Sequence, residues 1–218
     1  MGRVAAVIYD HDGTLVDSLA VVVEATNTTL RERGFSERPA LEIIKGMAYP
    51  TIPRMGLHSQ VTDPEALAEL AREFYVVMHR LPHLVRAYDG VPDVITQIAA
   101  LGMPQGMVSN NSGTFIRAAM AHLGLASSFT AMLGEDDCPA PKPDHRGALL
   151  AAARCGVAPE TCLFIGDSPA DRDAAHGAGM CAVGVTWGIH DAAEMSAMGF
   201  DVLIDHPKDL LRLIKARD

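Results

Sequence analysis

The sequence predicts an α/β protein, a doubly wound parallel sheet of the Rossmann-like kind into which a block of α-helices is inserted. The apolar run Val4–Ile8, rich in β-branched residues, is typical of a buried parallel strand. Residues 17–87 show helical patterns and no strand pattern. From Tyr88 onward, short apolar runs alternate with helical patterns, as in a doubly wound sheet. We therefore expect residues 1–16 and 88–218 to form the core and residues 17–87 to form a separate helical cap.

The predicted helices have apolar residues three to four positions apart and end near glycine or proline. They cover residues 19–33, 39–45, 64–81, 91–101, 113–123, 145–154 and 207–215, with a further helix that ends at residue 178. The segment 47–59 contains Pro50, Pro53 and Gly56 and is expected to be broken. The predicted strands cover residues 4–8, 104–108, 129–133, 162–165, 181–185 and 202–204.

Composition limits the class of protein and its partners. The chain has 218 residues, of which 49% are hydrophobic and 21% are charged, an ordinary globular profile. A net charge of −9 without a Lys/Arg cluster argues against a nucleic-acid partner. The four cysteines have no CxxC spacing, so we expect buried free thiols. Without a signal pattern or membrane-length apolar run, we expect a cytoplasmic protein with no membrane partner. We expect a monomer or a dimer.

Two aspartates follow the first predicted strand, and Gly13 comes directly after them. Asp10 and Asp12 should emerge at the carboxyl end of that strand, where ligands bind in open α/β sheets. One interpretation is a solvated acidic turn. A calcium loop fits poorly, because Gly13 is the fourth residue of the run and the calcium loop requires glycine at the sixth. The third interpretation is a nucleophile and a proton donor beside a hard cation.

Polar residues also follow two other predicted strands. Ser109 and Asp167 come at strand ends, and Lys142 lies in a proline-rich loop before a helix. The carboxyl ends of parallel strands share one edge of a sheet, so these residues can converge. Carboxylates could hold Mg²⁺, while a hydroxyl and an ammonium could bind phosphoryl oxygens. Each of these three residues alone has an ordinary explanation as a turn, surface or helix-capping residue, but together with Asp10 and Asp12 they favour a phosphate site.

Four segments resemble the motifs of the haloacid dehalogenase-like hydrolase superfamily. They are Asp10–Thr14, Ser109–Asn110, Lys142–Pro143 and Gly166–Asp171. The helical segment 17–87 is similar to the cap that this superfamily inserts after its first motif. Tyr88–Pro92 and Val185–Gly188 further resemble phosphoglycolate phosphatases, although Asp89 and His145 stand where those relatives often have proline.

The resemblance implies a catalytic role for four residues. Asp10 would attack phosphorus and become an aspartyl phosphate, as carboxylate nucleophiles can. Asp12 would protonate the leaving oxygen and then activate the water that hydrolyses the intermediate. Ser109 and Lys142 would bind the phosphoryl group.

The resemblance also implies a Mg²⁺ site. It places the ion between Asp10, Asp167 and the backbone carbonyl of Asp12. It assigns Asp171 to orienting either the metal shell or Lys142.

The expected function is a Mg²⁺-dependent phosphatase acting on a small phosphorylated metabolite, with 2-phosphoglycolate or a sugar phosphate as the leading substrates. Asn110 is a candidate substrate-binding residue on the core. Lys45, Tyr49 and Arg54 are candidates in the cap, and an ordinary surface position is the alternative for each. The second hypothesis is a phosphosugar mutase of the β-phosphoglucomutase type. Lys45 with Gly46 resembles the start of the mutase specificity loop, but the arginine that follows there is absent. A non-catalytic binding protein would have no reason to keep all four motif residues.

Overall fold

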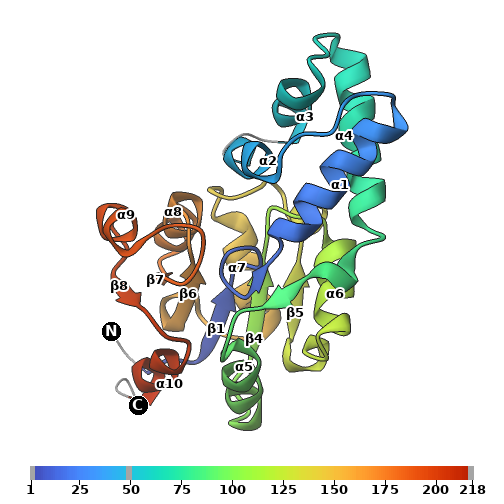
Figure 1. Ribbon diagram of the computed structural model, residues 1–218. Coiled ribbons are helices and arrows are strands. Elements are labelled where there is room, and N and C mark those ends of the chain that lie inside the picture. The colour runs from blue at the N-terminus through green and yellow to red at the C-terminus, as the bar shows by residue number, and fades with distance from the viewer. Residues whose placement is uncertain (1–2, 48–50, 216–218) are drawn as a thin grey trace. The chain divides into compact units, whose positions relative to one another are not determined.

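A computed structural model describes residues 3–47 and 51–215, which fall into two compact units. The core unit comprises Met1–Asp17 with Arg86–Asp218, and the helical unit comprises Ser18–Val85. Figure 1 labels the strands of the large sheet in the core unit and the helices of the helical unit. Two short strands of the core unit, β2 (Val16–Asp17) and β3 (Arg86–Ala87), pair antiparallel where the chain leaves and re-enters this unit. The sequence does not predict this pairing, because two residues are too few to show an alternating pattern.

In the described part of the core unit, six parallel strands form one sheet in the order β5-β4-β1-β6-β7-β8. Their bounds are Ala6–Tyr9 (β1), Gln105–Val108 (β4), Ala131–Leu133 (β5), Cys162–Gly166 (β6), Cys181–Val185 (β7) and Val202–Ile204 (β8). The parallel pairing confirms the predicted doubly wound fold. Strand β1 lies between β4 and β6, and all four of its residues are buried.

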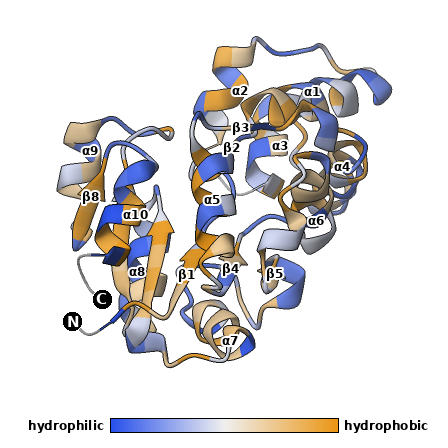
Figure 2. Ribbon diagram, turned by 90° about the horizontal axis from the view of Figure 1, so that it is seen from below, coloured by the Kyte–Doolittle hydropathy of each residue, from blue (hydrophilic) through white to orange (hydrophobic). Residues whose placement is uncertain are grey.

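Helices cover both faces of this sheet, as Figure 2 shows from below. Ala6 and Ile8 of β1 belong to an apolar cluster with residues of α7 (Arg146–Cys155) and α8 (Pro169–Gly177). On the other face, Tyr9 lines a small apolar cavity together with residues of α5 (Val91–Ala100) and α10 (Lys208–Lys215). Successive residues of a strand point to opposite faces, so a sheet covered twice requires the continuous apolar run seen in β1. The remaining helices of the core unit include α6 (Gly113–His122).

The helical unit contains four α-helices among its described residues. They are α1 (Leu19–Glu32), α2 (Ala40–Gly46), α3 (Thr51–Ser59) and α4 (Pro64–Met78). Helix α3 corrects the prediction of a broken segment for residues 51–59, while Pro50 lies outside the described residues. Pro53 lies in the first turn of α3, where backbone N–H groups have no acceptor within the helix, so the missing N–H of proline removes no helical hydrogen bond. Gly56 allows close packing. A Cβ at Gly56 would lie 3.1 Å from the Leu67 side chain on α4.

Two further features differ from the sequence-based expectations or refine them. Helix α9 (Ala192–Ala197) was not predicted, and a capping box between Asp191 and Glu194 begins it. The cysteines are free, as predicted, although Cys138 is only half-buried. No helix in the described ranges is both long and apolar enough to cross a bilayer.

Candidate active site

Asp10 and Asp12 follow β1 at the carboxyl edge of the sheet. The Asp10 N–H donates to the carbonyl of Ile165 at 2.8 Å, which extends the pairing with β6 by one residue. The chain then turns at Gly13, whose φ of +78° suits glycine. A Cβ at Gly13 would overlap Oδ2 of Asp167, so only glycine lets this loop pass so close to that carboxylate.

Ser109 directly follows β4, and the two asparagines after it bind other parts of the site. The buried Ser109 hydroxyl accepts a hydrogen bond from the N–H of Asn111 at 3.1 Å. The Asn111 amide donates to Oδ2 of Asp12 at 3.1 Å. Asn110 donates to the carbonyl of Lys142 at 2.9 Å and accepts from its N–H at 2.7 Å. Asn110 therefore fixes the Lys142 loop, and its proposed contact with substrate stays a prediction.

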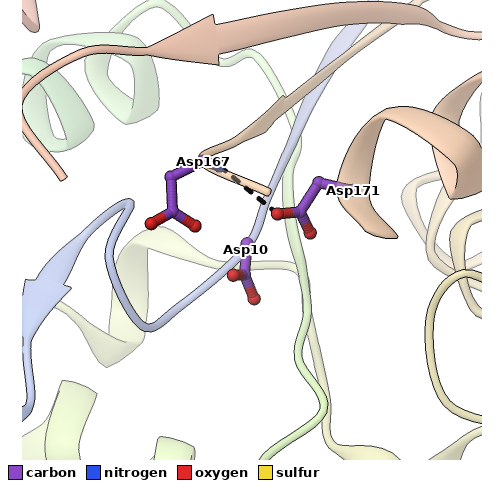
Figure 3. A group of neighbouring side chains, drawn as sticks. All are labelled: Asp10, Asp167 and Asp171. Atoms are coloured by element: carbon purple, nitrogen blue, oxygen red, sulfur yellow. Dashed lines mark hydrogen bonds between the residues drawn. The ribbon is translucent and has the colours of Figure 1, made fainter. Parts of the chain in front are cut away.

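Asp167 and Asp171 come from the junction between β6 and α8. Ser168 and Asp171 form a capping box, in which Oδ2 of Asp171 accepts from the Ser168 N–H at 3.1 Å and from its hydroxyl at 2.6 Å. The same oxygen accepts from the Asp167 N–H at 3.3 Å, shown as the dashed line in Figure 3. These bonds hold Asp171 so that its other oxygen is directed toward Lys142.

Lys142 forms ion pairs with carboxylates that follow two different strands, Asp10 after β1 and Asp171 after β6. Its Nζ lies 2.5 Å from Oδ1 of Asp10 and 2.6 Å from Oδ1 of Asp171, and all three side chains are buried. Of the two roles predicted for Asp171, the structure shows the contact with Lys142. The alternative explanation of Lys142 as a solvated surface residue is wrong, because Lys142 is buried and two carboxylates compensate its charge within the fold.

Burial controls the charges of this cluster. Burial raises the pKa of Asp10 to about 7, even against the lowering effect of Lys142. Burial, together with the charges of Asp10 and Asp171, raises the pKa of Asp167 to about 8. Burial opposes the charged form of Lys142, but Asp10 and Asp171 outweigh it and raise the pKa of the ammonium. Three carboxylates thus face one ammonium, which leaves negative charge uncompensated when all are ionised.

This excess of negative charge fits a hard divalent cation. Oxygen atoms of Asp10, Asp167 and Asp171 lie within 4.8 Å of one another, and Figure 3 shows the three carboxylates around a common space. Oxygen ligands are those Mg²⁺ prefers. The Asp12 carboxylate is not part of this group, and the backbone role expected for Asp12 stays a prediction. Because both oxygens of Asp171 already accept hydrogen bonds, Asp10 and Asp167 are the better ligands.

Two side chains that contact the first motif, His11 and Trp187, were not among the candidate site residues. His11 is fully buried, with Nδ1 3.2 Å from Oδ2 of Asp12 and its ring edge-on to Phe115. The only sign in the sequence of a role for His11 is its position between Asp10 and Asp12. Trp187, in the loop after β7, donates from Nε1 to the carbonyl of Thr14 at 2.9 Å and so fastens the loop that carries Asp12.

The cap candidates do not share one environment. Lys45 is exposed near the end of α2. Tyr49 lies outside the described residues. Arg54 is only 7% exposed, so the surface alternative is wrong for this residue.

Replacing Lys142 with methionine is expected to destabilise the metal-free protein by about 3–5 kcal/mol, the usual effect of leaving buried charges without their partner. Asp10 and Asp171 would lose the cation that lies between them. Urea unfolding at constant protein concentration measures the change. Lys208→Met, at an exposed position, is the matched control and should stay within about 0.5 kcal/mol of wild type. Equal effects of the two substitutions would contradict the electrostatic role of Lys142.

Comparison with known proteins places the chain in a family. Residues 7–185 match the model of the haloacid dehalogenase-like hydrolase family. The chain belongs to this family, as its motifs predicted. An N-acetylmuramic acid 6-phosphate phosphatase of Pseudomonas aeruginosa is 29% identical over 97% of this chain and 95% of its own length. A phosphoglycolate phosphatase of Synechococcus elongatus is 30% identical over 96% of both chains. These relatives confirm the predicted enzyme class, a phosphoric monoester hydrolase.

Solved structures support the fold. A predicted phosphoglycolate phosphatase from Haemophilus somnus superposes with a TM-score of 0.87 at 22% identity, over 98% of this chain and 99% of that one. A haloacid dehalogenase-like hydrolase from Streptococcus pneumoniae gives 0.82 at 20% identity, over 96% and 98%. At these identities the likeness concerns the fold alone.

Proposed function

We propose that this protein hydrolyses a small phosphate monoester in a Mg²⁺-dependent reaction, through a phosphoryl group carried on Asp10. The observation that carries the proposal is the buried cluster of Asp10, Lys142 and Asp167 at the carboxyl edge of the sheet. Asp10 and Asp167 supply carboxylates for a cation, and Lys142 supplies a positive charge beside the nucleophile. Phosphate release from a panel of monoesters, with and without Mg²⁺, tests this function.

In the first step, a carboxylate oxygen of Asp10 attacks phosphorus, and the bond from phosphorus to the leaving oxygen breaks. Asp12 donates its proton to that leaving oxygen. In the second step, Asp12 removes a proton from water as the water oxygen bonds to phosphorus, and the bond between phosphorus and Asp10 breaks. Hydrogen bonding from Asn111 and the contact with His11 orient the Asp12 carboxyl for both transfers.

The phosphoryl oxygens need positive charge and hydrogen-bond donors near Asp10. Lys142 is held 2.5 Å from Asp10 by Asp171 and by the two hydrogen bonds of Asn110, so its ammonium is already in place. Ser109 would donate its hydroxyl proton to a phosphoryl oxygen, since the same oxygen atom accepts from Asn111. A bound Mg²⁺ would supply further charge compensation for the phosphoryl group.

We propose that the substrate is 2-phosphoglycolate or a sugar phosphate, and that the enzyme acts on this small phosphorylated metabolite in the cytoplasm. The named activities of the relatives support it, since they are phosphatases for phosphoglycolate and for N-acetylmuramic acid 6-phosphate. The relatives are named as phosphatases and do not support the mutase hypothesis. The arginine that a mutase would have after Lys45 and Gly46 is also missing. We propose that the helical unit acts as the cap that selects the leaving group, while the core residues handle the phosphoryl group common to all substrates.

Mg²⁺ is expected to stabilise the folded protein, and more so at pH 8 than at pH 6. Without metal, Asp10 and Asp167 ionise in the folded protein only near pH 7 and 8, but near their ordinary value of 3.8 when unfolded. The free energy of unfolding of the metal-free protein therefore falls as the pH rises from the unfolded pKa values to the folded ones. A cation bound to the ionised carboxylates offsets this loss. At a hundredfold excess over its dissociation constant, Mg²⁺ should add about 2.7 kcal/mol.

Thermal unfolding with and without MgCl₂ at both pH values measures this effect. Asp167→Asn should remove most of the stabilisation, since it deletes one of the two best ligands. Asp173→Asn, an exposed change on α8, should keep it. An undiminished Mg²⁺ effect in Asp167→Asn would show that the ion binds elsewhere.

A further inference from the structure

Trp187 is the only tryptophan of the chain and lies in the loop between β7 and α9 of the core unit. Its half-buried ring lines the small apolar cavity next to Tyr9, Leu15 and Ile95. A phenylalanine ring would serve this packing as well. The indole N–H has a separate task, because it donates to the carbonyl of Thr14 at 2.9 Å.

The acceptor of this bond belongs to the turn that carries Asp12. The turn has hydrogen bonds of its own, from the N–H groups of Leu15 and Val16 to the carbonyl of His11 at 3.0 and 3.1 Å. The Thr14 carbonyl takes no part in these bonds. The internal bonds therefore fix the shape of the turn, and the bond from the indole fixes its position against the rest of the core unit.

The loop that carries Trp187 also packs directly against this turn. A Cβ at Gly188 would lie 2.3 Å from the carbonyl oxygen of Gly13, so the two main chains touch without an intervening side chain. The turn has a further anchor in the main chain, from the N–H of Tyr88 to the carbonyl of Leu15 at 3.2 Å. Loss of the indole N–H therefore loosens the turn and leaves it in place.

The position of this turn matters because Asp12 is the proposed proton donor. The Asn111 amide and the His11 ring contact Oδ2 of Asp12, at 3.1 and 3.2 Å. They hold the carboxyl in one direction, and the backbone beneath it must be fixed as well. Proton transfer needs the two heavy atoms within about 2.6–3.2 Å of each other. A displacement of about 1 Å in a reacting group can cost roughly a hundredfold in rate.

We propose that Trp187 is a positioning residue for proton transfer by Asp12, and that it acts through its hydrogen bond to the Thr14 carbonyl. The inference rests on the proposed phosphatase function. In the step concerned, the proton passes from the Asp12 carboxyl to the leaving oxygen as the bond from that oxygen to phosphorus breaks. The contribution of Trp187 is therefore large for alkyl esters, whose leaving oxygen needs a proton, and small for nitrophenyl esters, whose leaving oxygen does not.

The test compares kcat/KM for the two kinds of ester, because this ratio covers the events up to departure of the leaving group and excludes the later hydrolysis on Asp10. The esters are nitrophenyl phosphate and the alkyl monoester that wild type cleaves fastest, at saturating Mg²⁺. Trp187→Phe keeps an aromatic ring and deletes the N–H. It should lower kcat/KM for the alkyl ester by about 5- to 30-fold, the scale of one hydrogen bond, and change the nitrophenyl value by at most about twofold.

A single tryptophan allows the N–H alone to be changed. Biosynthetic replacement of tryptophan by β-(3-benzothienyl)alanine puts sulfur in place of the N–H and keeps the shape of the ring. This protein should show the same selective loss for the alkyl ester. Replacement by 7-azatryptophan keeps the N–H and should keep the wild-type ratio of the two kcat/KM values.

Two controls separate positioning from a general loss of structure. Tyr9→Phe deletes another aromatic hydrogen bond of 2.9 Å, from Tyr9 to Gln105, and should keep the ratio. Calorimetric titration of Trp187→Phe should give a Mg²⁺ affinity within about threefold of wild type, because Asp167 has its own hydrogen bond to Asp171.

Three results would overturn the inference. They are an unchanged ratio in Trp187→Phe or in the benzothienylalanine protein, an equal loss for both esters, and a loss of Mg²⁺ affinity as large as the loss of rate. Absence of phosphate release from every ester would instead refute the proposed function itself.

Discussion

Asp10→Asn is expected to lower phosphate release by roughly 10⁴- to 10⁶-fold, the scale of loss when a nucleophile is removed. An amide oxygen is a poor nucleophile, and the substitution keeps the size and position of the side chain at the end of β1. Lys142 would keep its contact with Asp171, so the site should remain assembled. Initial rates under saturating Mg²⁺ and substrate, with mass spectrometry to exclude conversion of Asn back to Asp, measure the effect.

The control for Asp10→Asn is a measurement of its stability by urea unfolding. Asp10 is buried with a raised pKa, so a neutral amide should not add a desolvation penalty, and the urea midpoint should stay near that of wild type. If the folded Asp10→Asn protein released phosphate within about a hundredfold of the wild-type rate, a side chain other than Asp10, or water itself, would have to be the nucleophile.

Asp12→Ala is expected to lower turnover by about 10²- to 10⁴-fold, the usual contribution of a general acid–base group. Its carboxyl contacts Asn111 and His11 and is not one of the three carboxylates grouped at the candidate cation site. The loss should be smaller for a nitrophenyl ester, whose leaving oxygen needs no proton. Steady-state rates for alkyl and nitrophenyl esters of phosphate, compared in the same variant, measure this difference.

Mg²⁺ affinity separates the two roles that Asp12 could have. Calorimetric titration of Asp12→Ala should give an affinity close to that of wild type, whereas Asp167→Asn should lose most of it. Asp12→Asn, which keeps an oxygen for the Asn111 amide, distinguishes a lost proton donor from a disordered loop. A collapse of Mg²⁺ affinity in Asp12→Ala would place its side chain on the metal.

The architecture of the core could be predicted from local patterns because they record burial directly. A sheet covered on both faces needs unbroken apolar strands, and β1 and β7 have them. The position of Asp10 and Asp167 follows from the same fact, since parallel strands bring their carboxyl ends to one edge. This rule predicts the edge of the sheet at which each strand ends. It does not predict which atoms meet there.

The remaining features depend on contacts between segments far apart in the sequence. Pro53 and Gly56 indicated a broken segment, but α3 forms because the proline falls in its first turn and the glycine packs near Leu67. The hydrogen bond from Trp187 to Thr14 spans most of the chain. The burial of Arg54 against Phe74 is likewise a tertiary contact that no local pattern reports. Each would require knowledge of the packing before it could be inferred.

The central claim is a phosphoryl group carried covalently by Asp10, and rapid acid quench with peptide mapping tests it most directly. Asp12→Asn should be mixed with substrate and Mg²⁺, quenched at increasing times, digested and analysed by tandem mass spectrometry. Slowed hydrolysis of the intermediate should let a phosphoryl group accumulate on the peptide that contains Asp10, and it should disappear as phosphate is released. Product formation over a full turnover without any phosphorylated Asp10, in this variant and in wild type, would contradict the account.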